Sequence, residues 1–326
     1  MKTLTRTILL LIAPAAISNA AILTVDNRPS SSAMFNSFVD AYAVANDGDT
    51  ILLAGSSTNY TGRTIHKRLT IIGPGYFHNE NGIPGTNPNR ASITLTLASD
   101  PLLGSSSGTK LLGLSGDFSV QSNLSGVVID KCLSQSIGVG QWLFASPVSI
   151  TRCNGSGLPL SFSAGSTGSI IRNSIVGTLT FSTTGINADR LVITNGLTGN
   201  PSTSISNSIF VLSNASSFIR NSTSVSNCMA VGFATLPEGG GNINGQLVNN
   251  IFLNTGSDDG KWRLKAGSPA LGAGTGGSDM GAFGGPNPYV LSGLPGIPRI
   301  TRIVATSTVT STSGLRLEVN AQGFAD

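Results

Sequence analysis

The chain has 326 residues, of which 10% are charged and 41 are glycine, and its formal net charge is +4. Serine, threonine and asparagine are frequent and glutamate is scarce, a composition that favours strands and turns. No stripe of lysine and arginine with interleaved aromatic residues occurs in the sequence, so nucleic-acid binding finds no support. Three cysteines are too few for a disulfide framework.

Residues 1–20 predict a signal peptide. Lys2 and Arg6 precede a short apolar run over 8–17, and small residues end the segment at Ala20. The apolar run is too short to span a bilayer, although an uncleaved anchor is the alternative. We therefore expect a secreted or cell-surface protein without a membrane span after signal removal.

Residues 33–48 predict an amphipathic helix. Its apolar side chains recur at three- and four-residue steps, which gives the helix one apolar face. These residues are Phe35, Phe38, Ala41, Tyr42 and Ala45. Turn-forming residues over 46–49 end the helix, and 50–54 predicts a buried strand. A repetitive β structure exposes apolar core at its first turn, so we interpret this helix as an N-terminal cap.

Short β-rich runs follow between residues 69 and 129. Two stretches rich in glycine, proline, serine or asparagine, 73–90 and 99–108, interrupt these runs. Such stretches predict loops that leave the wall of the structure.

A four-residue phrase then recurs: an apolar residue, a spacer, asparagine or a basic residue, and cysteine or serine. The phrase begins at Ile129, Ile150, Ile171, Ile205, Val225 and, loosely, Val248. The first two intervals are 21 residues each and the last two are 20 and 23. The interval of 34 residues after Ile171 leaves room for a further turn near 186–193. A repeat of this length predicts a solenoid.

The third position of the phrase predicts a corner of each coil. Side chains alternate between the two faces of a strand, so the apolar residue points inward and its spacer outward. Asparagine tolerates the left-handed backbone region that a tight corner needs. Stacked coils would place these amides above one another as a ladder. The predicted ladder consists of Asn173, Asn207, Asn227 and Asn250.

All three cysteines occupy the fourth position of the phrase. Cys132 and Cys153 belong to consecutive coils, which stack about 4.8 Å apart. That distance permits a disulfide, but parallel neighbours in register rarely aim their Cβ atoms at each other. We favour packing of two small buried side chains, and the bonded alternative remains open.

The C-terminal part predicts a closure and a tail. Residues 257–285 are rich in glycine and close the solenoid, which as a domain covers 21–288. The tail over 289–326 predicts a linker and two short strands. Four prolines over 286–298 allow this linker to be a strap that lies along the surface. These strands are too short for an independent domain.

The phrase, the coil length and the cap resemble the right-handed parallel β-helix proteins of the pectin-lyase-like class. The stretches 38–42, 47–53 and 65–73 are similar to the cap helix and first coil of that family, and 267–285 is similar to the closing motif of exported bacterial members. The resemblance implies an all-β fold, a right-handed parallel β-helix solenoid with an N-terminal capping helix. It says little about activity, because this fold hosts lyases, hydrolases and adhesins.

Basic side chains on the wall are the first candidates for a site. With Trp142, which would stack on a sugar, they form the predicted substrate-binding set: Lys131, Arg152, Arg172, Arg190 and Trp142. Family members that cleave acidic polysaccharides use an arginine or lysine base with Ca²⁺ held by clustered acids. Here the wall offers only Asp130 and Asp189, so we predict no catalytic set. Arg172, Arg190 and Asp189 remain the candidates under a lyase interpretation.

Other groups predict no metal or cofactor site. Asp258 and Asp259 are adjacent and would point in opposite directions, which favours a loop role. His66 and His78 lack the neighbouring carboxylate of a zinc site. We expect no cofactor, with Ca²⁺ considered only for a lyase.

The sequence therefore favours an exported, non-catalytic β-helix protein of the cell surface or extracellular matrix that contacts a polysaccharide or surface glycan. The alternative is a polysaccharide lyase or glycoside hydrolase acting on an acidic polysaccharide, with a site built from 73–90 and 99–108. Two carboxylates, or an arginine beside such a pair, in one groove would support the alternative. Arg172 and Arg190 on separate, acid-free surfaces would exclude it.

Overall fold

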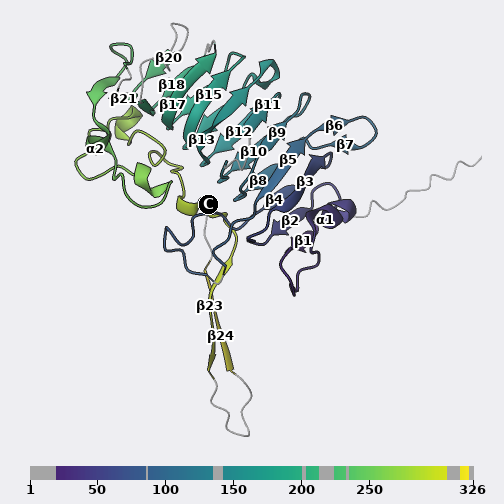
Figure 1. Ribbon diagram of the computed structural model, residues 1–326. Coiled ribbons are helices and arrows are strands. Elements are labelled where there is room, and N and C mark those ends of the chain that lie inside the picture. Colours follow the sequence, from purple (N-terminus) through teal and green to yellow (C-terminus); the bar gives the residue numbers. More distant parts are fainter. Residues whose placement is uncertain are drawn as a thin grey trace, which may run out of the picture.

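The computed structural model describes residues 20–85, 87–134, 142–199, 203–212, 224–232, 235–306 and 316–322. The predicted signal peptide, apart from Ala20, lies outside these residues. In the described part the chain winds into a right-handed parallel β-helix (Figure 1), which confirms the predicted fold class. No described helix is long and apolar enough to cross a membrane.

Two ten-stranded parallel sheets form the walls among the described residues. Sheet A consists of β1 (Ile22–Val25), β2 (Thr50–Leu53), β4 (Thr70–Ile72), β8 (Lys110–Leu112), β10 (Val127–Asp130), β12 (Val148–Thr151), β14 (Ile170–Arg172), β16 (Asn187–Asp189), β18 (Ser204–Ser206) and β20 (Ser224–Ser226). Sheet B consists of β3 (Tyr60–Ile65), β5 (Ile93–Leu97), β9 (Phe118–Val120), β11 (Trp142–Phe144), β13 (Asn154–Phe162), β15 (Ile175–Phe181), β17 (Val192–Gly199), β19 (Ile209–Leu212), β21 (Met229–Gly232) and β22 (Ile243–Gln246). A shorter third row of bridges joins Ser92, Ser115, Leu133 and Asn154.

The core lies between the two sheets. The apolar residue of each phrase stacks on its counterpart, as Ile129 does on Ile150 and Ile150 on Ile171. On the other wall the rings of Phe144, Phe162 and Phe181 stack with centroids 5.1 and 5.6 Å apart. Burial of these columns stabilises the stack because the apolar surface of each side chain is removed from water on all sides.

Cys132, Cys153 and Cys228 are free, fully buried thiols beside these columns. The amide of Cys132 donates to the sulfur of Cys153 at 3.4 Å. Burial raises the pKa of Cys228 to about 12 and holds the pKa of Cys132 well above its usual range. The thiols therefore serve as small packing groups.

One residue per coil turns the chain from sheet A to sheet B with a left-handed backbone. We call these residues the corner column: Gly113, Lys131, Arg152, Asn173, Arg190, Asn207 and Asn227. The extra turn expected after Ile171 is β16 and β17, with Arg190 at its corner. Asn250 is not a corner, contrary to the predicted ladder, because it lies within α2 (Val248–Ile251). There the chain has left the stack, and Ile251 packs over the end of the core at helical spacing from Val248.

The N-terminal cap helix α1 (Phe38–Val44) is shorter than the predicted 33–48. It begins after Ser37, whose Oγ accepts the amide of Val39 at 3.1 Å. Residues 33–36 are not helical, because Phe35 pairs in parallel with Val25 and extends the first coil. Phe38, Ala41 and Tyr42 are buried against the first coils. Figure 1 shows α1 at the N-terminal end of the stack, beside β1 and β2.

The remaining elements lie outside the two walls. The described residues of 73–90 contain no strand, whereas the second predicted loop contains the hairpin of β6 (Ser99–Asp100) and β7 (Gly104–Ser105). Short 3₁₀ turns are η1 (Ala164–Ser166), η2 (Gly260–Trp262), η3 (Thr275–Gly277) and η4 (Leu291–Gly293). An antiparallel hairpin, β23 (Arg299–Thr306) with β24 (Arg316–Gln322), projects from the solenoid (Figure 1).

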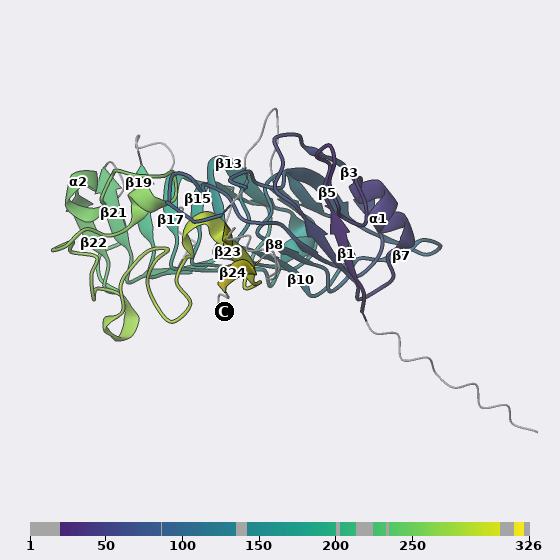
Figure 2. The same cartoon turned by 90° about the horizontal axis from the view of Figure 1, so that it is seen from below.

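Residues 254–298, the return segment, run back along the corner column. Figure 2 shows this segment, coloured green to yellow, passing from the C-terminal end of the stack toward its middle. The side-chain amide of Asn173 donates to the carbonyls of Ala282 and Gly284 at 3.1 and 2.8 Å. Asn207 Oδ1 accepts the amide of Thr275 at 2.7 Å, and the hydroxyl of Thr275 accepts from Asn227 at 3.2 Å.

These contacts replace the amide ladder that we expected. Asn173 and Asn207 are two coils apart because Arg190 occupies the corner between them, so their amides do not stack directly. Tyr289 and Leu294 are buried, so the chain remains packed on the solenoid past residue 288, where we expected the linker to begin.

Candidate binding groove

The basic residues predicted to bind a substrate are mostly used in building the corners. Arg152 forms a two-pronged ion pair with Asp130, with Nε–Oδ1 and Nη2–Oδ2 distances of 2.9 and 2.7 Å. Arg190 pairs with Asp189 and donates to Ser278 of the return segment at 3.2 Å. Lys131 is 3% exposed. These cations hold the structure together and are closed to a ligand.

Arg172 and Trp142 differ from the other predicted residues. Arg172 is exposed on β14, and its side chain makes no hydrogen bond or ion pair with the described residues. Its neighbour in register is Asp189, the acid that also pairs with Arg190, so the two arginines do not lie on separate, acid-free surfaces. Trp142 belongs to β11, and its side chain lies outside the described part of the structure. The predicted substrate-binding set is therefore not gathered in one hollow of the described surface.

A groove that sequence reasoning missed lies where loop 73–90 passes the third row of the solenoid. It consists of two adjoining hollows of about 130 and 590 Å³ that share Asn59, Arg90 and Ser92. Further polar residues line it: Ser56, Ser57, Asn79, Glu80, Asn89, Thr94, Asp117 and Asp258. The groove thus places carboxylates and an arginine together. This is the arrangement that would support a polysaccharide lyase or glycoside hydrolase.

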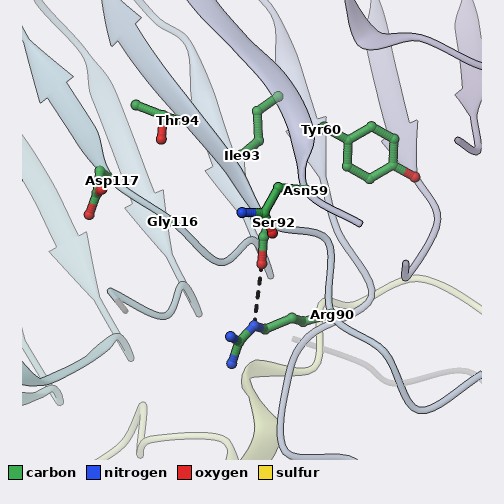
Figure 3. A pocket seen from close by; sticks show the side chains of 8 residues that line it. All are labelled: Asn59, Tyr60, Arg90, Ser92, Ile93, Thr94, Gly116 and Asp117. Atoms are coloured by element: carbon green, nitrogen blue, oxygen red, sulfur yellow. Dashed lines mark hydrogen bonds between the residues drawn. The ribbon is translucent and has the colours of Figure 1, made fainter. Parts of the chain in front are cut away.

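The smaller hollow contains Asp117, which follows the sharp corner at Gly116 (Figure 3). Glycine is needed at 116, where φ is 138° and a Cβ would lie 2.0 Å from the carbonyl oxygen of Ile93. One carboxyl oxygen of Asp117 is buried without a hydrogen-bond partner in the described residues. Burial accordingly raises the pKa of the Asp117 carboxyl, since the charged form loses water.

Arg90 lies at the junction of the two hollows. Its Nε donates to the hydroxyl of Ser92 at 3.3 Å, the bond drawn in Figure 3. Burial lowers the pKa of the Arg90 guanidinium, and the charge of Glu80 opposes that shift. No carboxylate in the described residues lies within ion-pair distance of Arg90, so its charge is available to a ligand.

The larger hollow has an aromatic wall made by Phe77. The backbone of Phe77 is left-handed, with φ of 51°, and the ring packs edge-on against Tyr76 at 5.2 Å. A bulky residue in this region is an outlier that costs of the order of 1–3 kcal/mol. Such a conformation persists only where surrounding contacts enforce it.

The return segment supplies those contacts. The carbonyl of Phe77 accepts the amide of Asn81 at 3.0 Å and the hydroxyl of Ser292 at 3.2 Å. The amide of Tyr76 donates to the Ser292 carbonyl at 2.8 Å. Tyr76 and Tyr289 share a hydroxyl–hydroxyl bond of 2.8 Å, and burial holds the pKa of both phenols well above the usual range.

Asp259 is the centre of this arrangement. Its side chain is fully buried and accepts from the Ser257 hydroxyl at 2.6 Å, the Asn81 amide at 3.0 Å and the backbone amide of Ser292 at 2.7 Å. The adjacent Asp258 points the other way, lines the groove, and pairs with Lys261 at 2.8 Å. Asp259 therefore ties loop 73–90 to the return segment and positions both walls of the groove.

His78 closes loop 73–90 on itself. Its two ring nitrogens lie 3.0 and 2.9 Å from the carbonyls of Pro88 and Pro74, at the two ends of the loop. The ring is thus a structural bridge between the two ends of the loop. No group of three or more His, Cys, Asp or Glu side chains in the described residues is placed to hold a metal ion.

The groove can bind a polar ligand with an apolar face, and its carboxyl groups could exchange protons with it. A hint of the groove was present in the sequence: loop 73–90 leaves a coil abruptly and contains Glu80 in a chain with few acids. Asp258 could not be linked to it by sequence, because the return segment delivers that residue from far along the chain. No protein-family model matches this chain, and no curated protein matches its sequence.

Proposed function

We propose that this is an exported β-helix protein of the cell surface or extracellular matrix, related to the pectin-lyase-like class, that binds carbohydrate in the groove. The basic and apolar pattern of residues 1–20 supports export. The observation that carries the binding proposal is Phe77, a bulky ring held in a left-handed backbone on the wall of an otherwise polar hollow.

The chemistry of the groove suits a sugar. A sugar ring has an apolar face that packs on an aromatic ring and hydroxyls that exchange hydrogen bonds at its rim. Around Phe77, the side chains of Asn59, Asn79, Asn89 and Ser92 offer amides and hydroxyls, and Arg90 offers an unpaired guanidinium. Long, rigid walls on either side would keep these groups in place without a cost in ordering.

A glycan array followed by calorimetry tests this proposal with Phe77→Gly. Glycine adopts the same backbone without strain, so the fold should be retained while the ring is lost. We expect affinity for the best glycan to fall at least about tenfold, equivalent to about 1.4 kcal/mol. Asn123→Gly is the matched control, since Asn123 is an exposed left-handed residue away from the groove. No glycan binding, or equal binding by Phe77→Gly, would overturn the proposal.

Hydrolysis of a bound glycan is the second candidate function, and Asp117 favours it. A glycosidase needs one carboxyl that stays protonated and a second carboxylate across the bond. Asp117 has a buried, unpartnered oxygen, while Glu80 and Asp258 line the same groove. Release of reducing ends that disappears in Asp117→Asn would support hydrolysis. Unsaturated products would point instead to elimination.

A further inference from the structure

Carboxylates outnumber cations in the groove. Its described lining has three carboxylates, Glu80, Asp117 and Asp258, and one guanidinium, Arg90. Lys261 pairs with Asp258 from outside this lining. Like charges repel more strongly in a partly desolvated hollow than in bulk water. A polymer that carries a carboxylate on each sugar is therefore poorly matched to this surface.

Two of these carboxylates are open to a ligand. Glu80 is exposed and makes no hydrogen bond or ion pair with the described residues. The Asp258 side chain is 57% exposed, and its partner Lys261 is 36% exposed. An exposed surface pair of this kind contributes little to stability, so a ligand cation can replace Lys261 at little cost.

The aromatic wall completes a cation site. Phe77 lines the same hollow of about 590 Å³ as Glu80 and Asp258. The face of an aromatic ring attracts an ammonium group, and carboxylates bind it through charge-assisted hydrogen bonds. A ring and two open carboxylates in one hollow are the groups that recognise a protonated amine.

We infer that the ligand of this groove is a glycan with free amino groups, a polymer of amino sugars, and not a polyuronate. This inference rests on the proposed carbohydrate-binding function and specifies its ligand class. The amides, hydroxyls and Arg90 around the hollow bind the sugar hydroxyls, while Glu80 and Asp258 bind the ammonium groups. A fully neutral glycan would leave Glu80 without an ion pair and Asp258 with only its exposed partner Lys261.

Calorimetry with four probes tests the inference on the full chain. The probes are an oligomer of 2-amino-2-deoxyglucose, its fully N-acetylated counterpart, an oligogalacturonate and an oligolysine peptide. The amino oligomer should bind best, at least about tenfold tighter than the N-acetylated one, and added salt should weaken it. The oligogalacturonate should bind weakest.

Charge-removing variants locate the effect. In Glu80→Gln combined with Asp258→Asn, both exposed positions keep their shape, and the advantage of the amino oligomer should disappear. Glu238→Gln, which removes an exposed acid outside the groove, is the matched control and should leave that advantage unchanged.

The outcomes separate the two claims. Equal binding of the amino and N-acetylated oligomers, or tighter binding of the oligogalacturonate, with loss in Phe77→Gly overturns the amino-sugar inference and keeps the carbohydrate function. Binding of oligolysine alone overturns the inference in favour of a basic peptide. Absence of binding by every probe and by the glycan array overturns both.

Discussion

The corner column and the groove both contain bulky residues with left-handed backbones, but they use them differently. Six corner residues have φ between 46° and 55° and recur once per coil, with side chains that bond to acids or to the return segment. Phe77, with φ of 51°, belongs to no such series and lines a hollow. A periodic left-handed residue reflects coil construction, whereas the isolated bulky residue supports the proposal of a binding site at the hollow.

The charges of the two regions show the same contrast. In the corner column Arg152 and Arg190 are neutralised by Asp130 and Asp189, and Arg190 also donates to Ser278 of the return segment. In the groove Arg90 and Glu80 have no ion-pair partner among the described residues. Paired, covered charges stabilise an architecture, while unpaired charges at a hollow are available for recognition.

Asp259→Ala should give the largest effect, because Asp259 connects the groove to the corner column through the return segment. Its removal leaves the buried backbone amide of Ser292 without its acceptor and takes one of two acceptors each from Ser257 and Asn81. We expect a loss of about 3 kcal/mol or more in unfolding free energy. Chemical denaturation measures this loss. Asp258→Ala is the control for the neighbouring exposed acid, and equal stability of the two variants would contradict the clamp that we assign to Asp259.

Two arginine variants should separate the regions. Arg152→Ala leaves Asp130 buried without its counter-charge, so stability should fall by about 2–3 kcal/mol while glycan binding is retained. Arg90→Ala breaks no ion pair and should cost less than about 1 kcal/mol, yet reduce glycan affinity. Denaturation and calorimetry on both proteins check the pair of outcomes. Reduced glycan binding by Arg152→Ala at unchanged stability would contradict the assignment of the corner column to stability and of the groove to binding.

The architecture was predictable from sequence because it is periodic. The phrase repeats its apolar residue and its corner residue in every coil, so register, core column and the extra turn at Arg190 followed from spacing alone. The cap helix was placed but extended too far, because Phe35 fits a helical pattern and is used in a bridge with Val25. Asn250 was misassigned because the phrase does not show where the stack ends.

The groove was not predictable for a physical reason. Its walls come from loop 73–90 and from Asp258 on a segment that folds back along the whole column, and no local pattern encodes such a return. The basic corner residues are predicted from the sequence to bind a substrate because charged residues are rare in this chain. Arg152 pairs with Asp130 one coil before it, and Arg190 pairs with Asp189, the residue before it. Ion pairs between such close neighbours in the coil stabilise the structure.

Asn173 tests the role of amides in the corner column. Asn173→Gly removes the bonds to Ala282 and Gly284 but keeps an easy left-handed backbone. Asn173→Ala removes the same bonds and adds backbone strain, so it should be less stable than the glycine variant by about 1 kcal/mol. Thermal or chemical denaturation of the two variants measures this difference. Equal stability would mean that the corner does not require a residue tolerant of φ near 46°.

Asp117→Asn should give the smallest change in stability. The direction in which this change depends on pH distinguishes the unpaired Asp117 from the paired acids of the corner column. Burial raises the pKa of Asp117 in the folded state, so the folded protein holds this proton more tightly than the unfolded chain does. Its contribution to stability is therefore present at low pH and is lost as pH rises through the unfolded value, about 3.9, toward the folded one. The asparagine side chain of Asp117→Asn has no carboxyl proton to lose, so the variant should gain stability relative to the original protein as pH rises over this window.

Denaturation midpoints of the two proteins, measured across this pH window, test whether their stabilities diverge. Parallel curves, or a variant that loses ground as pH rises, would show that the carboxylate is solvated or paired in the folded groove, as Asp130 is in the corner column.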